Sequence, residues 1–283
     1  MKTRAMPLKI FNQALNYLLL ILIGLFAVFP FLWTLAISIT DKTVVSGVSI
    51  FDFPQSLFPK AITFNNFLEV YRVFGLEKYL FNSLVISGLT VIGTLLVSAM
   101  AAYPLSKMSF VGRDLIFGAM LATLVLPSET NFIVNVLTLN KIGLLGTYWG
   151  VVIPTIATAF GIFIMRQTYM AVPDSLLEAA RIDGATEFQI LWRIMIPLSR
   201  PALTALGIFT LVNTWNSYFW PSVALLGADN LQPLSVAMLK LKGQFNHDSF
   251  NVAAGAMIMM LPVLIVFVAA QRLFMRGLEG AVK

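Results

Sequence analysis

The sequence predicts an all-α integral membrane protein with six transmembrane helices and one helical loop on the cytoplasmic side. Of its 283 residues, 58% are hydrophobic and only 11% are charged, whereas a soluble domain carries about 25% charged residues to face water. The apolar residues fall in continuous windows of about 20 residues, the length at which a helix crosses a bilayer core of about 30 Å. Strands are a poor alternative, because a lipid-facing barrel strand alternates polar and apolar residues over about 10 positions.

Six windows are long and apolar enough to be membrane spans, and together they predict a single transmembrane domain over residues 1–283. The first begins after Lys2, Arg4 and Lys9. Its charge-free stretch is longer than the apolar core of a cleaved signal peptide, which has about 7–15 residues, so we interpret it as a span. The predicted spans lie at 15–37, 81–104, 115–137, 147–166, 202–224 and 252–274.

The distribution of basic residues predicts that both termini lie in the cytoplasm. An even number of spans places the termini on one side, and 12 of the 19 Lys and Arg residues fall on that side. Basic loop residues concentrate on the cytoplasmic side of a membrane protein, so this side is assigned to the cytoplasm. Its longest connection covers residues 167–201. On the opposite side, apolar residues at helical spacing predict a short helix at 64–74.

Composition excludes several classes of function. There is no cysteine, so disulfides, zinc–thiolate sites and thiol nucleophiles are excluded. The single histidine, His247, is interpreted as a solvated loop residue, and no metal site is expected. The net charge of +6 does not indicate nucleic-acid binding, because the basic residues form no run that could follow a phosphate backbone.

The connection at 167–201 has the local features of two short helices joined by a tight corner. Pro173 is expected to end the preceding helix, and Ser175 with Glu178 predicts a capping box that starts the next one. That helix should end at Gly184, because glycine adopts the left-handed conformation after a helix at low cost.

A second short helix is predicted to follow this corner. Thr186 and Gln189 form its expected capping box, and it should run until Pro197. Apolar side chains along it, among them Ile194, are available to pack against the membrane domain. The whole connection is therefore expected to be an ordered helical hairpin.

Two interpretations of this hairpin remain open from the residues alone. Ala179 and Ala180 leave the first helix slim at its middle, which would let another protein approach closely. Charged side chains around them would set the register of such a contact. A hairpin that lies at the membrane interface without a partner explains the same pattern. The charged residues are Glu178, Arg181, Asp183 and Glu187.

The same stretch resembles the EAA loop of binding-protein-dependent ABC importers. The matching positions are Glu178-Ala179-Ala180, Gly184 after three residues, Ile194 after nine more, and Ile196-Pro197. The family usually has Leu-Pro at the last pair, and the Ile-Pro found here conserves volume. Shorter matches to the carbohydrate branch, and within it to the maltose-type second permease subunit, extend over nearly the whole chain. They include Asn82-Ser83, Ala101-Ala102-Tyr103, Leu105-Ser106-Lys107, Gly143-Leu144-Leu145, Tyr148-Trp149-Gly150, Gln271-Arg272 and Gly277-Leu278.

This resemblance implies a permease subunit of an ATP-driven importer for sugars, in the cytoplasmic membrane of a bacterium or archaeon. The chain has no G-x-x-x-x-G-K-[ST] phosphate loop, so ATP hydrolysis is expected on a separate subunit. The implied partners are a homologous second permease that completes a heterodimer, two ATP-binding subunits that hold ATP and magnesium, and an extracytoplasmic sugar-binding protein. No cofactor is expected on this chain. The residues implied to couple to the ATPase are Glu178, Ala179, Ala180, Arg181, Asp183, Gly184, Ile194 and Pro197.

Polar side chains inside two predicted spans are candidates for a substrate path. Burying polar groups in lipid is costly, so they should face the bundle interior or a water-filled cavity. Amides bond sugar hydroxyls and aromatic rings stack on sugar rings. Helix–helix contacts and an interfacial aromatic belt are the alternative explanation. The candidates are Glu129 and Asn131 in the third span, and Asn213, Trp215, Asn216 and Tyr218 in the fifth.

Glu129 leaves three roles open: a substrate contact, a pairing with the sister subunit, or a position at the external interface. Pro127 beside it suggests a kink, which favours the interface. The main alternative function is an ion-coupled secondary transporter of a small polar solute, which would need ionisable groups in several spans or broken helices in two inverted halves. A membrane-embedded enzyme has less support, because the spans contain no His, Cys or paired carboxylates.

Overall fold

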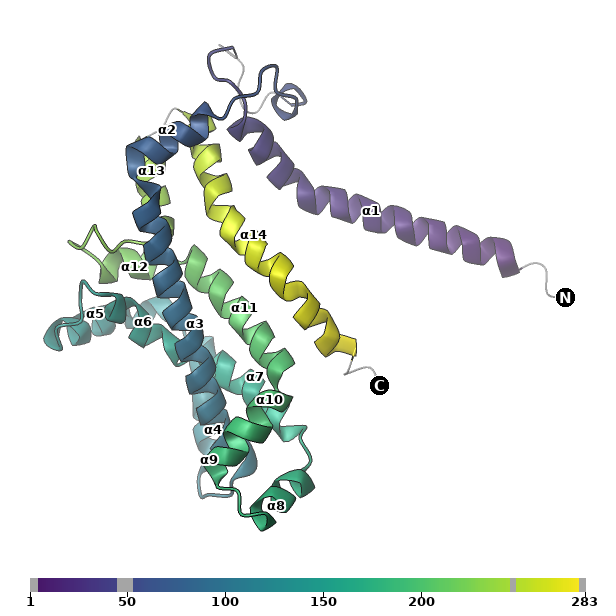
Figure 1. The fold of residues 1–283 in the computed structure, drawn as a ribbon, viewed down its shortest axis with the longest axis vertical. Coiled ribbons are helices and arrows are strands. Elements are labelled where there is room, and N and C mark those ends of the chain that lie inside the picture. The colour runs from purple at the N-terminus through teal and green to yellow at the C-terminus, as the bar shows by residue number, and fades with distance from the viewer. Residues whose placement is uncertain (1–4, 45–52, 245–247, 280–283) are drawn as a thin grey trace. The chain divides into compact units, whose positions relative to one another are not determined.

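The computed structural model describes residues 5–44, 53–244 and 248–279. Within these ranges the ordered elements are helices, and the only strand-like pairing is a single antiparallel bridge between Thr40 and Ile62. The predicted all-α class is therefore confirmed. The helices can be followed from the N-terminus to the C-terminus in Figure 1.

The chain folds as two compact units. The first combines Met1–Phe74 with Lys240–Met260, and the second combines Gly75–Leu239 with Leu261–Lys283. Each unit has its own internal packing and is described by itself. The single transmembrane domain expected over residues 1–283 stays a prediction.

In the first unit, two helices flank an extracytoplasmic segment by our topology. The long apolar helix α1 covers Ala5–Ser38, and α2 covers Asn65–Phe74, where a short helix was predicted. Between them, the short 3-10 turn η1 (Gln55–Leu57) lies against the end of α1. There the indole nitrogen of Trp33 donates a hydrogen bond of 3.0 Å to the hydroxyl of Ser56.

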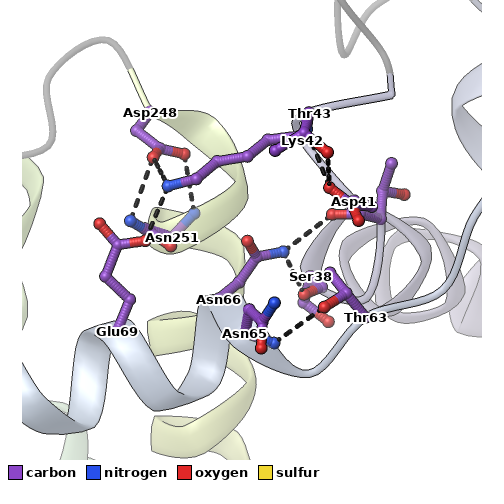
Figure 2. Close-up of polar contacts among 11 residues, drawn as sticks. Ser38, Asp41, Lys42, Thr43, Thr63, Asn65, Asn66, Glu69, Asp248 and Asn251 are labelled. Atoms are coloured by element: carbon purple, nitrogen blue, oxygen red, sulfur yellow. Dashed lines mark hydrogen bonds and ion pairs between the residues drawn. The ribbon is translucent and has the colours of Figure 1, made fainter.

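A lysine joins the segments of this first unit through two carboxylates. The Lys42 ammonium lies 2.7 Å from the Glu69 carboxylate on α2 and 2.8 Å from the Asp248 carboxylate. Asp248 immediately precedes α14 (Ser249–Glu279), and it also accepts a 3.0 Å hydrogen bond from the amide of Asn251. Figure 2 shows the four side chains converging on one point. The cluster therefore ties the end of the α1 segment to α2 and to the start of α14.

A buried asparagine completes this junction. The Asn66 side-chain amide donates to the backbone carbonyls of Ser38 and Thr40, both at 2.9 Å (Figure 2). These bonds satisfy carbonyls at the C-terminal end of α1, where intrahelical donors are missing. At Lys42, partial burial opposes the charged form, but the hydrogen bonds and charges of Asp248 and Glu69 outweigh it and raise the pKa of the ammonium.

The second unit is built around α3 (Leu76–Lys107), which packs against α6 (Tyr148–Ile156), α7 (Ala159–Met170) and α11 (Arg200–Asn216). The face of α3 turned to these helices carries small and hydroxyl-bearing side chains, which allow helix backbones to approach closely in a membrane bundle. Its buried residues include Ser83, Ser87, Thr90, Thr94, Ser98, Ala99 and Ala102.

Two glycines show how close this approach is. A Cβ atom at Gly161 on α7 would lie 2.4 Å from the Ser98 hydroxyl, and one at Gly93 on α3 would lie 2.6 Å from a methyl group of Ile156. Neither contact leaves room for a side chain. These positions therefore need glycine for packing, with ordinary helical backbone angles.

Near the N-terminal end of α3, Asn82 holds a loop in place. Its amide nitrogen donates to the carbonyls of Asn230 at 3.0 Å and Gln232 at 2.9 Å, and its oxygen accepts from the Tyr148 hydroxyl at 2.6 Å. One buried amide thus joins α3, the start of α6 and the loop before α13 (Leu234–Gln244).

Three of the predicted spans fall within single long helices. The spans at 15–37, 81–104 and 252–274 lie in α1, α3 and α14. In the described part of the chain, these three helices are each long and apolar enough to cross a membrane.

Two further predicted spans are broken helices. The span at 147–166 is covered by α6 and α7, which meet at a 45° bend. The span at 202–224 is covered by α11 and α12 (Phe219–Ala224), separated at Ser217 and Tyr218. Two bent pairs pass as candidate spans, α6 with α7 and the helical segment Glu187–Leu198 with α11, the latter bent by 78°. Counting each pair as one span gives up to five candidate crossings among the described residues, so the six-span topology stays a prediction.

The predicted third span, 115–137, is also interrupted. It is covered by α4 (Arg113–Ala122), the 3-10 turns η2 (Thr123–Val125) and η3 (Ser128–Asn131), and α5 (Phe132–Lys141). Pro127 explains the break. Its ring disfavours helical geometry at the preceding residue, and Leu126 is extended, with φ −80° and ψ 129°.

Candidate functional site

The connection at 167–201 contains a helix with one buried and one exposed face. This helix, α8 (Asp174–Ile182), turns Leu177 inward, where its side chain is only 1% exposed. Leu177 belongs to the same hydrophobic cluster as Met165 and Tyr169 of α7, and Ala180 packs against that cluster. α8 is therefore packed against the hydrophobic core of the second unit and is not a free segment.

A glycine corner ends α8, as predicted. Gly184 has a φ of 85°, a conformation that favours glycine because it has no Cβ atom. The amide of Ala185 donates to the Ala180 carbonyl at 2.9 Å, and the amide of Gly184 donates to the Arg181 carbonyl at 3.0 Å. These two bonds satisfy carbonyls at the helix end and set the direction in which the chain leaves.

The start of α8 differs from the prediction. A capping box between Ser175 and Glu178 was expected, but the helix begins two residues earlier, with Asp174 as its first residue and Pro173 at the cap position. No side chain caps this end. The reason is that Asp174 in the first turn is held by Lys107 of α3, which fixes the start of the helix from outside the loop.

The second helix of the hairpin has its predicted start. The hydroxyl of Thr186 accepts from the Gln189 amide, and the Gln189 side chain accepts from the Thr186 amide, which confirms the capping box. The helical path runs through α9 (Glu187–Ile190), the π-helical segment η4 (Leu191–Met195) and α10 (Ile196–Leu198). This path continues one residue beyond Pro197, where it was predicted to end. Ile190, Leu191 and Met195 are buried in the cluster that also receives Leu177.

An ion pair braces the two helices across the corner. The Arg181 guanidinium on α8 lies 2.8 Å from the Glu187 carboxylate on α9. The same carboxylate accepts a hydrogen bond from the Tyr103 hydroxyl of α3. Both helices are thus linked to each other and to the end of α3.

A second attachment fastens the beginning of α8. The Lys107 ammonium lies 2.6 Å from the Asp174 carboxylate and donates to the Val172 carbonyl at the same distance. The hydrogen bond and the charge of Lys107 lower the pKa of Asp174. Neither Tyr103 nor Lys107 was predicted to hold the loop. Their spacing of four residues at the end of one predicted helix places them on one face, and this pattern could have indicated a shared contact.

The outer face of the hairpin is exposed and partly apolar. Ile182 is 86% exposed and Phe188 is 63% exposed. Of the residues implied to couple to an ATPase, Glu178, Ala179, Arg181, Asp183 and Gly184 are exposed on or beside α8, Ala180 and Ile194 face the core, and Pro197 is half-buried in α10.

The candidate residues for a substrate path are not gathered in one place. Trp215 is buried at 3% exposure, whereas Asn213 and Asn216 are exposed, and their amides donate to carbonyls four residues earlier on α11. Tyr218 is exposed at the break after α11, and Asn131 is exposed at the cap of α5. The side chain of Glu129 lies outside the described part of the structure.

Metal binding has no support from the side chains that the structure describes. Among them, no group of three or more His, Cys, Asp or Glu residues could hold a metal ion. His247 lies outside the described ranges.

Comparisons with known proteins agree with the architecture of the loop. Residues 93–280 match the family described as "Binding-protein-dependent transport system inner membrane component". This segment contains the whole hairpin and the bent helices around it.

Several curated relatives match along almost their entire length. The chain is 35% identical over 267 residues to the arabinooligosaccharides transport system permease protein AraQ of Halalkalibacterium halodurans, covering 92% of this chain and 93% of the relative. It is 31% identical over 278 residues to the sn-glycerol-3-phosphate transport system permease protein UgpE of Yersinia enterocolitica, covering 94% and 96%. It is also 31% identical over 275 residues to the lactose transport system permease protein LacG of Rhizobium radiobacter, covering 95% of each.

A solved structure has the same fold. The crystal structure of a bacterial ABC transporter involved in the import of the acidic polysaccharide alginate contains a chain that aligns with a TM-score of 0.78 and 28% sequence identity. The alignment covers 96% of this chain and 98% of that one. The expectation drawn from the EAA-type loop is confirmed, and the chain belongs to the family of binding-protein-dependent transport system inner membrane components.

Proposed function

We propose that this chain is a transmembrane permease subunit of an ABC importer for sugars, and that its cytoplasmic hairpin couples a separate ATPase to alternating access. The observation that carries the proposal is the two-sided seating of α8. Its inner face packs on the membrane core through Leu177, while its outer face exposes Glu178, Ala179 and Ile182. A helix held in this way can transmit the movement of a bound partner to the helices beneath it.

The fastening of the hairpin supports this coupling role. Lys107 and Tyr103 of α3 hold Asp174 and Glu187, which are the first residues of the two helices α8 and α9. A force applied to the outer face of α8 is therefore passed to α3, the central helix of the second unit. We propose Glu178, Ala179, Ala180, Arg181, Asp183, Gly184, Ile194 and Pro197 as the coupling set.

The proposed partners follow from the relatives. The curated relatives are named as transport system permease proteins for oligosaccharides, lactose or glycerol phosphate. A second alginate-importer structure is described in complex with an oligosaccharide-bound periplasmic protein. We propose a homologous second permease, two ATP-binding subunits that carry ATP and magnesium, and an extracytoplasmic binding protein. ATP hydrolysis is assigned to those subunits, and both termini of this chain to the cytoplasm.

The remaining substrate-path candidates keep the status of proposed contacts. Asn131, Asn216 and Tyr218 are exposed and available to a path formed with a second permease. Trp215 is buried in the second unit, so we assign it to packing beside the path. An ion-coupled secondary transporter is not favoured, because the relatives over the full chain length are permeases of binding-protein-dependent systems.

Mass spectrometry of the complex that co-purifies with the affinity-tagged chain in mild detergent tests the proposal. We expect a P-loop ATPase and a second polytopic subunit. Charge reversal by Glu178→Lys on the outer face should release the ATPase and retain the second permease. The control is Asp114→Lys, a charge reversal at the start of α4 and outside the hairpin. Because Asp114 contacts both Arg113 and Arg166, this is the harsher change of the two, and it should still retain the ATPase. Recovery of the wild-type chain alone, or only with copies of itself, would overturn the proposal.

A further inference from the structure

A cavity lies inside the second unit, where α3, α6, α7, α11 and α12 meet. Its volume is about 280 Å³. Small-molecule sites usually have volumes of roughly 300–1,000 Å³, so this cavity is near the lower end of that range. It suits one sugar ring better than a whole oligosaccharide.

The surface of the cavity is mostly apolar, and six residues with hydroxyl groups are among those that line it. Asn213 adds a side-chain amide, the one substrate-path candidate that reaches this cavity. Hydroxyls and amides can both donate and accept hydrogen bonds, which matches the bonding capacity of a sugar hydroxyl. The hydroxyl-bearing residues are Thr90, Thr155, Thr158, Thr210, Thr214 and Ser217.

One of these hydroxyls is buried without any partner in the protein. Thr90 is 1% exposed, and its oxygen makes no hydrogen bond. The oxygen itself is fully covered, so a rotation of the Thr90 side chain is needed to present its unused donor and acceptor to a group in the cavity. Such a contact would remove the cost of an unsatisfied buried group, about 1–3 kcal/mol. Two other hydroxyls also keep part of their hydrogen-bonding capacity. The Thr155 hydroxyl donates to the Val152 carbonyl and can still accept, and the Thr158 hydroxyl accepts from the Gly161 amide and can still donate.

Two helix breaks meet at the cavity. α6 ends at Ile156 and α7 starts at Ala159, while α11 ends at Asn216 before Ser217. Irregular backbone at membrane depth is tolerated where it is buried in protein or lines a water-filled space. In transporters, broken helices commonly place their ends around a substrate. The backbone and the side chains therefore indicate the same position.

Aromatic rings form a fixed apolar wall on the same cavity. The rings of Phe160 and Phe209 lie 4.8 Å apart between centroids. The indole of Trp220 is held by a 3.1 Å hydrogen bond to the Val151 carbonyl. All three rings line the cavity, and aromatic faces suit the C–H face of a sugar ring.

The lining residues carry no charged side chain. A carboxylate or a phosphate placed here would lose its hydration without gaining a counter-charge, which is strongly unfavourable. The cavity chemistry therefore selects for a neutral polyhydroxylated group and against uronates and sugar phosphates.

We propose that this cavity binds one neutral sugar ring of the transported cargo, so that this subunit itself contacts substrate and disfavours anionic cargo. The proposal rests on the proposed importer function. It is independent of the coupling hairpin, because none of the cavity residues belongs to it.

Protection of a single cysteine tests the binding step. The chain has no cysteine, so Asn213→Cys in the complex gives one thiol at the cavity, provided that cysteines in the partner subunits are blocked or replaced. We expect arabinose, galactose and glucose, each at high millimolar concentration, to include at least one sugar that slows its reaction with a small methanethiosulfonate reagent by about 5-fold. Glycerol 3-phosphate and galacturonate should leave the rate unchanged. No slowing by any neutral sugar, or equal slowing by the anions, would overturn the proposal.

Hydroxyl deletion tests whether the contact matters for transport. Thr90→Val on α3 and Thr210→Val on α11 remove cavity hydroxyls at nearly constant volume. The control is Thr204→Val, also on α11, because the Thr204 hydroxyl donates to the Arg200 carbonyl outside the cavity. With the sugar that protects best, we expect the half-saturating concentration for protection to rise about 5-fold in the cavity variants and to stay unchanged in the control. Equal values in all three variants would overturn the assignment of the site.

The two levels of the proposal fail in different ways. If neutral sugars protect the cysteine but the complex shows no ATP-driven sugar uptake in proteoliposomes, the importer function is wrong and the binding site stands. If uptake of a neutral sugar is ATP-driven but neither protection nor the hydroxyl deletions respond, the cavity is not a cargo site and the importer function stands.

Discussion

The corner at Gly184 allows a quantitative test of how the hairpin is held. Gly184 has a φ of 85°, in a region that costs a residue with a side chain about 1–2 kcal/mol. A Cβ atom built there meets no heavy atom within 4 Å, so a substitution would strain the backbone without a steric collision. Gly184→Val should carry the full cost because its side chain is β-branched. Gly184→Asn should carry little, since asparagine tolerates the left-handed region.

The expected magnitude follows from this strain. Every 1.4 kcal/mol changes an equilibrium tenfold, so a cost of about 1–2 kcal/mol shifts the ratio of closed to open corners roughly 5-fold to 30-fold. The closed corner is reported by the Ala185 amide, which donates to the Ala180 carbonyl at 2.9 Å. Amide hydrogen exchange of Ala185 in the purified complex should therefore accelerate by that factor in Gly184→Val.

Transport coupling provides the functional measurement for the same variants. Sugar imported per ATP hydrolysed in proteoliposomes should fall in Gly184→Val and remain near the wild-type value in Gly184→Asn. The backbone explanation would be refuted if both variants exchange and transport alike, whether both are normal or both are impaired. A loss confined to transport, with normal exchange at Ala185, would show that the side chain disturbs the partner contact and not the corner.

Three contacts outside this corner give four further predictions. Lys107→Met should expose α8 to limited proteolysis, because the Asp174 carboxylate and the Val172 carbonyl both lose the Lys107 ammonium. The milder Asp174→Asn keeps the bond to the Val172 carbonyl and should have a smaller effect. The pKa of Asp174 is lowered in the folded loop. Its contribution to the stability of the loop is therefore fully present above the ordinary pKa of 3.8 and is lost as the pH falls through the folded pKa. Proteolysis of the wild-type loop should rise only below about pH 4, and Asp174→Asn should show no such rise. Tyr103→Phe removes one hydrogen bond to a carboxylate, worth about 1.5–3 kcal/mol, and should increase amide exchange in α9 while Tyr17→Phe, on exposed α1, should not. Lys42→Met leaves two carboxylates facing each other and should lower the melting temperature of the complex, with part of the loss recovered in a double variant that also carries Asp248→Asn; no change in Lys42→Met would contradict the junction described above.

Local chemistry in the sequence predicted the hairpin well. The glycine corner at Gly184 and the capping box of Thr186 and Gln189 depend on residues within a few positions of each other, and both have the predicted geometry. The start of α8 was misplaced because a distant residue, Lys107, holds Asp174. No local rule can anticipate a contact between residues 67 positions apart.

The membrane spans likewise have features that local sequence predicts and features that depend on distant contacts. Long charge-free windows predicted helices α1, α3 and α14, because hydrophobicity and length alone decide whether a helix suits a bilayer. Of the three breaks, the one at residues 126–127 was indicated by Pro127, whereas those at 157–158 and 217–218 were not predicted. Proline kinks can be suspected locally, but whether a broken end is tolerated depends on what the surrounding helices supply to its backbone.

The sequence by itself determined the class of protein, the existence of the hairpin and the family resemblance, since each depends on composition or on short fixed spacings. Tertiary structure alone decided which polar residues share a site. Asn213 and Trp215 are two positions apart, yet one lines the cavity and the other is buried away from it, and Thr90 joins the cavity from another helix. The physical reason is that a cavity is defined by the close packing of several helices, and its lining depends on which face each helix turns inward.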